Sequence, residues 1–379
     1  GASAPDGPAR WLRAVDARVE ELVIGGRSLG RIEARARRQA DGLAIECAGE
    51  ALSGEIALPD QPTLQHPVTV ALKRLKVGGA VEPPSERAAA FGDLNPRGLP
   101  PLAVTVADLR WEDIALGRLR LNVAPRPNGI HLNDIRLDSD QQRIEASGEW
   151  SDGEAGRFSK LKATLRGRSL GETLASFGYP GSGVERGETQ AELAVEWKAA
   201  LPDFALERLD GVLKLQVGSG QLRDIKPGLG RLIGMLNMQN LTRRLSFDFS
   251  DLFQPGMSFD RISGEFSFRH GSAFTDDLLI EAPAARIEIR GRTGLRARDY
   301  DQIITVLPNV GGALPVAGAL AGGPALGAAV FVAERLLQKD IEQATRYRYA
   351  LKGSWDNPAI EPLQRPPEQN PAKGFASDN

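Results

Sequence analysis

The sequence has little of what enzymes and nucleic-acid-binding proteins need. It contains three histidines, His66, His131 and His270, and none has metal-ligand neighbours at the spacing that zinc sites use. No nucleophile elbow, phosphate-binding loop or HExxH motif is present. The 47 Lys and Arg residues are balanced by 49 Asp and Glu residues, so the concentrated positive charge that binds nucleic acid is missing. We therefore predict a non-enzymatic protein that uses no metal or cofactor and binds no nucleic acid.

Cysteine is also nearly absent. Cys47 is the one cysteine, so no internal disulfide can form, and we expect it to be a small packed side chain. The first residues lack the basic start and apolar core of a signal peptide. They could be a remnant of cloning, in which case the chain would be a fragment of a longer protein. With 379 residues, the chain could hold two or three compact domains or one elongated domain.

Strands with period-two alternation dominate the sequence. For example, Leu193, Val195 and Trp197 share one face of a predicted strand, whereas Glu192 and Glu196 share the other. One apolar and one charged face is the pattern of an antiparallel sheet with one solvated side. The 42 glycines and 25 prolines fit many short strands joined by turns. Few helical segments are predicted, so the apolar face must fold over on itself, pack on a second sheet or line a sheltered concave surface.

The strand pattern recurs along the chain. Residues 29–32 have a counterpart at 116–119, and residues 143–148 have one at 286–291. Recurrence of this kind indicates a repeating architecture that presents one continuous face. Asp276-Asp277 follow a hairpin glycine, and we interpret them as turn residues. The prediction is one elongated, strongly twisted antiparallel sheet.

Two segments depart from the strand pattern. Apolar residues at helical spacing predict a short amphipathic helix over 228–242. Residues 302–333 carry no charge, and their prolines and glycines predict a pair of helices over 311–345. This segment could be a buried cap or a membrane-inserting element, whereas its prolines argue against a single spanning helix. The residues predicted to form the cap or the membrane contact are Leu232, Ile233, Leu236, Leu320, Leu326, Val330, Phe331 and Leu336.

Several runs in the last third of the chain share a family pattern; they are residues 228–253, 259–266, 319–324, 347–349 and 353–358. Together they resemble the C-terminal region of the AsmA-like family of Gram-negative envelope proteins. The likeness is specific from about Leu209 to Pro362, and the first two hundred residues share only the generic strand repeat.

The resemblance implies a mainly β fold, an elongated, twisted, antiparallel and repeating β-groove that is taco-like in section, with a few short C-terminal helices. Such a groove carries phospholipid through the periplasm from the inner to the outer membrane. Exposing an acyl chain to water costs about 0.8 kcal/mol per CH₂, so the groove needs a continuous apolar lining. The predicted lining residues are Leu213, Leu215, Phe247, Phe249, Phe266, Phe268, Ile287 and Ile289.

The resemblance also implies partners and a place in the cell. The C-terminal end should contact the inner leaflet of the outer membrane, or a partner there, and the protein should be monomeric. Family members are anchored in the inner membrane by an N-terminal helix that this chain lacks, so the chain should be a C-terminal fragment. We expect a lead, strand blocks, a family module and a disordered tail; their bounds are 1–10, 11–205, 206–361 and 362–379.

Two alternatives stay open. The apolar strand faces could form the interior of a closed β-sandwich. The chain could also be a structural factor that assists outer-membrane assembly, with a dry core and no lipid cargo. Proline-rich breaks at 59–67 and 83–101 predict long connections between strand blocks in either case.

Overall fold

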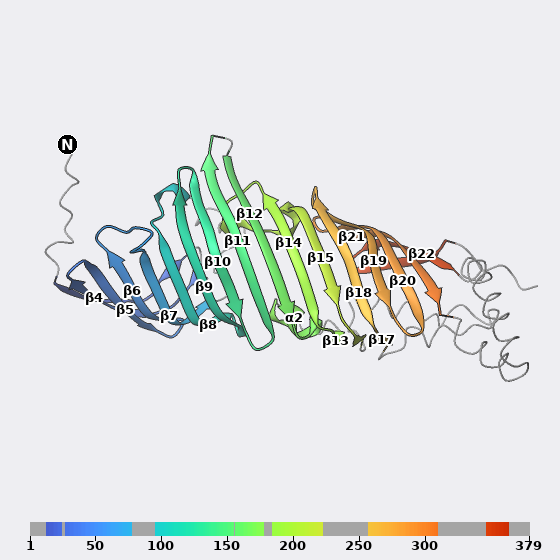
Figure 1. Ribbon diagram of the computed structural model, residues 1–379, viewed down its shortest axis with the longest axis horizontal. Coiled ribbons are helices and arrows are strands. Elements are labelled where there is room, and N and C mark those ends of the chain that lie inside the picture. The colour runs from blue at the N-terminus through green and yellow to red at the C-terminus, as the bar shows by residue number, and fades with distance from the viewer. Residues whose placement is uncertain are drawn as a thin grey trace, which may run out of the picture. The chain divides into compact units, whose positions relative to one another are not determined.

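The computed structural model is mainly β, which confirms the predicted fold class (Figure 1). The chain divides into two compact units. The first unit contains residues 1–180, 188–215 and 267–271, and the second contains 181–187, 216–266 and 272–379. The structure describes residues 13–24, 27–77, 95–154, 156–177, 184–222, 257–309 and 346–363.

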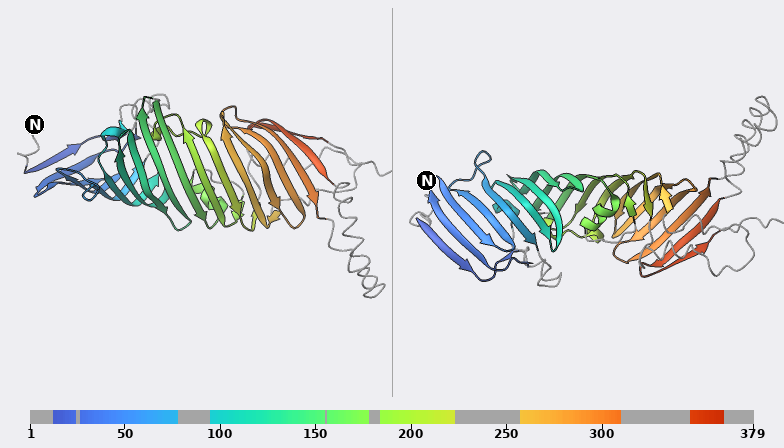
Figure 2. Two further views of the ribbon diagram at one scale, coloured as in Figure 1. Left: turned by 45° about the horizontal axis from the view of Figure 1, so that its top comes forward. Right: turned by 90° about the horizontal axis from the view of Figure 1, so that it is seen from below.

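The first unit is built on one sheet whose strands follow one another in chain order. β1 pairs with β4, each strand from β4 to β11 pairs with the next one, and β12 pairs with β14. β15 lies beside β14, and both further views show the same succession (Figure 2). The strands are β1 (Ala14–Val19), β4 (Ile32–Gln39), β5 (Gly42–Gly49), β6 (Leu52–Pro59), β7 (Val68–Val77), β8 (Leu102–Trp111), β9 (Ile114–Arg126), β10 (Gly129–Asp138), β11 (Gln142–Gly153), β12 (Gly156–Gly167), β14 (Thr189–Trp197) and β15 (Asp210–Val217), with a small hairpin of β2 (Val23–Ile24) and β3 (Arg27–Ser28).

One strand pair corrects the prediction of a wholly antiparallel sheet. β7 and β8 pair in parallel, with Val68 opposite Leu102 and Leu72 opposite Val106. Parallel neighbours need a crossover of a dozen or more residues, and residues 78–101 connect these two strands. The proline-rich break predicted at 83–101 falls within that connection, and the sheet is mixed rather than purely antiparallel.

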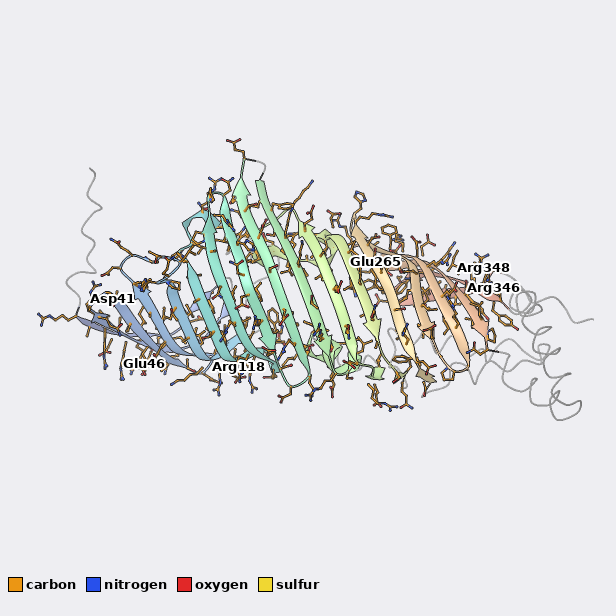
Figure 3. The ribbon with its side chains drawn as sticks, viewed as in Figure 1. Asp41, Glu46, Arg118, Glu265, Arg346 and Arg348 are labelled. Atoms are coloured by element: carbon orange, nitrogen blue, oxygen red, sulfur yellow. The ribbon has the colours of Figure 1, made fainter. Side chains whose placement is uncertain are left out.

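The two faces of the sheet differ as the alternation predicts. We name the face that carries Leu193 the inner face and the face that carries Glu192 the outer face. Across β12 and β14, Ala163 lies opposite Leu193. Glu46 and Arg118 belong to the outer face by their register (Figure 3). The inner face is therefore apolar and the outer face is charged.

The second unit contains a meander and a separate small sheet. Each strand from β19 to β22 pairs antiparallel with the next one. β18 lies beside β19 in the sheet. Between these two strands, the Glu265 amide donates to Asp277 Oδ1 at 2.8 Å. The small sheet has the order β13-β16-β17. The strands are β13 (Val184–Arg186), β16 (Gly220–Leu222), β17 (Met257–Phe259), β18 (Arg261–Arg269), β19 (Ser272–Glu281), β20 (Ala285–Gly294), β21 (Asp299–Pro308), β22 (Tyr347–Ser354) and β23 (Asn357–Pro362).

Helical turns occur where none was predicted. The predicted helical segments 228–242 and 311–345 lie outside the described residues, but the first unit contains α2 (Leu170–Ser176). Ser169 precedes α2, and its Oγ accepts a hydrogen bond from the Glu172 amide at 3.5 Å. Ser-x-x-Glu is a capping signal that the sequence analysis missed. Three short 3₁₀ turns accompany α2, namely η2 (Pro96–Gly98), η3 (Leu201–Asp203) and η4 (Leu206–Arg208).

We expect Ser169→Ala to loosen α2, because the first amides of the helix lose their side-chain acceptor. Loss of such a cap costs about 1 kcal/mol. Hydrogen exchange at residues 170–176 should be several-fold faster in this variant, whereas Ser169→Asp should keep the exchange rate close to that of the unmodified protein. Unchanged exchange in Ser169→Ala would show that tertiary contacts alone hold α2.

One further interpretation of the sequence is corrected by β19. Asp276-Asp277 were interpreted as turn residues, but they lie inside β19, where the register with β20 shifts between Thr275 and Leu278. They form a β-bulge, which bends a strand.

Candidate functional site

The candidate site is the middle of the inner face in the first unit. The registers of β11, β12 and β14 align three rows of uncharged residues across these strands. Gly211 in β15 lies against Val195, so residues at the same parity in β15 continue the rows. We call the half-buried side chains of these rows the floor; they are Ile144, Ala146, Leu161, Ala163, Leu165, Ala191, Leu193, Leu213 and Leu215.

Burial along these strands is opposite to that of a closed sandwich. Near the strand ends, inner-face side chains are buried: Trp150 is 4% exposed, Trp197 1% and Thr189 1%. Between these ends the apolar inner-face side chains are only half-buried, except Val195, which is 5% exposed. Two packed sheets would bury the middle of the face most deeply. Within the part of the chain that the structure describes, the floor therefore lies uncovered between two buried rims.

One rim is formed by the segment that follows β14. The Trp197 indole N–H donates to the Ala200 carbonyl at 3.0 Å, and the Phe204 ring meets the indole edge-on with centroids 5.5 Å apart. Ser159 Oγ donates to the Ala199 carbonyl at 2.9 Å. Ala200 is fully buried. These contacts fix the segment against the strand ends, so the rim is a packed and rigid border.

The opposite rim is formed by α2. Gln142 Nε2 donates to Ser176 Oγ at 2.7 Å, and Ser176 Oγ in turn donates to the Thr173 carbonyl. Thr173 packs closely on Gly167, since a Cβ at position 167 would lie 2.3 Å from Thr173 Oγ1. The glycine is therefore required for α2 to approach β12.

The inner face is closed at the N-terminal end of the sheet. The segment around the β2–β3 hairpin carries Leu22 and Leu29 onto Leu52, Leu72 and Val106. A backbone hydrogen bond of 2.7 Å from Leu29 to Leu22 holds the hairpin together. Here the face is a packed core, so the uncovered floor does not extend across all strands of the unit.

Cys47 lies at this closed end and is half-buried. It packs against the core beneath the hairpin, and burial raises the pKa of its thiol. The thiol therefore stays protonated at neutral pH and acts as a small packed side chain.

Among the described residues, no cluster of three or more His, Cys, Asp or Glu side chains could hold a metal ion. The same part of the chain has no helix with the length and apolarity required to span a bilayer. His131 lies on the outer face of β10, and His270 occupies a turn with a φ of 52°. Neither histidine lies in the floor.

Comparison with known proteins identifies the family. The family model of the YhdP protein matches residues 1–360. The chain belongs to the YhdP family. It is 26% identical over 376 residues to the intermembrane phospholipid transporter YhdP of Escherichia coli strain K12. That alignment covers 97% of this chain and 29% of the relative. No solved structure matches the chain significantly.

The family match confirms the recognition made from the sequence and extends it. The sequence analysis found specific likeness only from about Leu209, whereas the YhdP family model also covers the first two hundred residues. The floor of the first unit is therefore inside the matched region. By its name the relative is an intermembrane phospholipid transporter, and the chain spans less than a third of its length.

The predicted site residues are only partly in the described chain. Phe247 and Phe249 lie outside the described residues, and so do all eight predicted cap or membrane-contact residues. In the first unit, Leu213 and Leu215 belong to the floor. Phe268 lies in the last residues of β18, which from Ser267 on belong to the first unit, and its side chain is buried. In the second unit, Phe266 and Ile289 are half-buried and Ile287 is buried.

Sequence reasoning missed most of the floor. It placed the lining after Leu209, although Leu161, Ala163 and Leu193 follow the same alternation. The alternation of apolar and polar residues is present in these strands. It did not distinguish an uncovered face from the inside of a sandwich, because both require this alternation.

Proposed function

We propose that the chain is part of a phospholipid transporter and that acyl chains lie on the floor. The observation that carries the proposal is the burial pattern: an uncharged middle whose side chains, except Val195, are only half-buried between two buried rims. The name of the E. coli relative supports phospholipid as the cargo. The chain itself performs no chemistry in this role.

The floor fits the energetics of such a cargo. A sixteen-carbon chain in water costs roughly 12 kcal/mol, at about 0.8 kcal/mol per CH₂. A continuous apolar surface without charges or fixed hydrogen-bond donors removes this cost at each position along the floor. It binds the acyl chain about equally well at all of these positions. A phospholipid can therefore advance from strand to strand without a deep minimum that would hold it.

The finer parts of the proposal rest on the family. We propose that transport runs from the inner to the outer membrane across the periplasm, that an N-terminal helix anchors the full-length protein in the inner membrane, and that the chain acts as a monomer. The C-terminal end would contact the inner leaflet of the outer membrane or a partner there. Residues such as Leu320, Leu326, Val330 and Phe331 are the proposed contacts.

Photo-crosslinking on the two faces tests the proposal. A diazirine amino acid at Ala163, in the floor, should capture phospholipid from Escherichia coli lipid vesicles. The same group at Thr164, the next residue on the outer face, should capture little, because its side chain meets water and charged neighbours. Equal capture at both positions would contradict a one-sided lipid path.

The alternative of a structural factor with a dry core is favoured by one observation, the packed core of Leu29, Leu72 and Val106 beneath the β2–β3 hairpin. Native mass spectrometry of the purified protein separates the two functions. A transporter should retain phospholipid, whereas a structural factor should be free of lipid even after incubation with vesicles.

A further inference from the structure

The inner face of the second unit, defined as the face that carries Ile287, changes in polarity along its strands. Strands advance about 3.4 Å per residue, so six residues along β20 span about 20 Å. Over this distance the side chains pass from aliphatic to hydrogen-bonding; Ile287, Ile304 and Val306 are buried in one packed cluster, whereas Ile289 is half-buried. The cross-strand pairs of β20 and β21 are, in order, Ile287 with Val306, Ile289 with Ile304, Gly291 with Gln302, and Thr293 with Tyr300.

The polar end of this series presents hydrogen-bond donors. Gln302 Nε2 donates to Thr293 Oγ1 at 2.9 Å, which leaves the Thr293 hydroxyl proton available. Tyr300 is half-buried, and its hydroxyl has no hydrogen-bond partner among the described residues. Both hydroxyls can donate to a carbonyl oxygen that lies on this face.

The guanidinium of Arg298 lies beyond these donors, in the turn between β20 and β21. The Trp355 amide and indole N–H donate to the carbonyls of Arg298 and Asp299, at 2.8 and 3.3 Å. The indole ring lies 6.3 Å from the ring of Tyr300, and Arg298 Cζ lies 5.5 Å from the indole centroid. Arg298 thus stacks on a platform that continues the inner face, and its N–H edge remains available to an anion.

The one carboxylate in this turn does not cancel that charge. Arg292 binds Asp299 through two hydrogen bonds of 2.9 and 2.7 Å, and this contact holds the pKa of Asp299 below its usual value. Because Asp299 is paired with Arg292, it does not neutralise the positive charge of Arg298. By contrast, Arg348 lies on the outer face of β22 (Figure 3).

We propose that this end of the second unit binds the glycerophosphate part of one phospholipid. The order of the groups along β20 and β21 is that of the lipid: acyl chains on the half-buried Ile289, ester carbonyls at Thr293 and Tyr300, and the phosphate on Arg298. The floor of the first unit has no charge or cation in its rows and can contact only acyl chains. The proposal rests on the proposed transport function and adds a site that recognises the lipid's phosphate.

The test compares two lipids that differ only in the phosphate head group. A diazirine amino acid at Ile289 should capture phosphatidylethanolamine in preference to diacylglycerol with the same acyl chains. In Arg298→Gln this preference should fall about tenfold or more, as expected for loss of a charge-assisted hydrogen bond. Arg290→Gln is the matched control. It removes an exposed guanidinium from the outer face of β20, the strand that carries Ile289, and it should leave the preference for phosphatidylethanolamine unchanged.

A second crosslinking position separates this proposal from the transport function. At Ala163, in the floor of the first unit, the capture ratio of the two lipids should be the same in the unmodified protein and in Arg298→Gln. An unchanged ratio at Ile289 in Arg298→Gln, or an equal fall in capture of both lipids there, would overturn the phosphate site while leaving transport intact. Absence of capture at both positions in the unmodified protein would overturn the transport function itself.

Discussion

Replacing Leu193 by aspartate should empty the floor of phospholipid while the sheet stays folded. Leu193 is half-buried in the middle of the floor, opposite Ala163. An unpaired carboxylate against an acyl chain costs several kcal/mol, so capture by a crosslinker at Ala163 should fall about a hundredfold. Because the side chain is not fully buried in the protein, the loss of folding stability should be only about 1–2 kcal/mol.

The control for this variant is Ala194→Asp, which adds the same charge one residue away on the outer face. It should leave capture at Ala163 within about twofold of the unmodified protein, since it contacts water rather than the lipid path. Lipid capture by Leu193→Asp at the level of Ala194→Asp would mean that the floor is not where acyl chains lie.

Trp197→Ala should have the largest effect on stability. The side chain is 1% exposed, donates to Ala200 and meets the Phe204 ring. Truncating a buried tryptophan to alanine costs about 3–5 kcal/mol. The urea midpoint of the first unit, followed by circular dichroism, should fall accordingly, and hydrogen exchange in the rim segment after β14 should become fast.

Trp197→Phe retains a ring in the same cavity and loses the indole donor. It should cost about 1–2 kcal/mol, mainly for the unpaired Ala200 carbonyl. A loss below about 1 kcal/mol in Trp197→Ala would show that the rim segment contributes little and that the strand ends are held by their neighbours in the sheet.

Much of the fold could be predicted from local patterns. The alternation of Leu193, Val195 and Trp197 with Glu192 and Glu196 reports burial on one side, which any half-exposed strand requires. Since hairpins join sequence neighbours, the order of most strands follows from the chain itself. For this reason the mainly β class and the two-faced sheet were within reach of the sequence.

The features that were missed depend on contacts between distant residues. The parallel pairing of β7 with β8 is chosen by packing of Leu72 on Val106 and not by a turn signal. The bulge at Asp276-Asp277 replaces the predicted turn because Asp277 binds the Glu265 amide from the neighbouring strand. Neither partner can be read from the local sequence.

The candidate sites show the same division. Alternation indicates which residues share a face, but not whether a second layer covers them, and so the floor was not distinguished from a sandwich interior. The polar end of the second unit depends on a contact between Tyr300 and Trp355. Trp355 lies within a run that carried the family resemblance, yet its place beside Arg298 required the register of β21 and β22.

The parallel joint between β7 and β8 has a consequence for how the first unit folds. Hairpins on either side of the joint form by closing short turns, on microsecond timescales. The β7–β8 pair instead forms only when the two ends of a far longer segment, residues 78–101, come together. The entropy cost of this closure comes before any cross-strand contact stabilises the pair. We therefore expect two separate cooperative groups that dock late, one of β4–β7 and one of β8–β12 with β14. The slowest refolding phase should be sensitive to substitutions at Leu72 and Val106 and not to those in the hairpin turns.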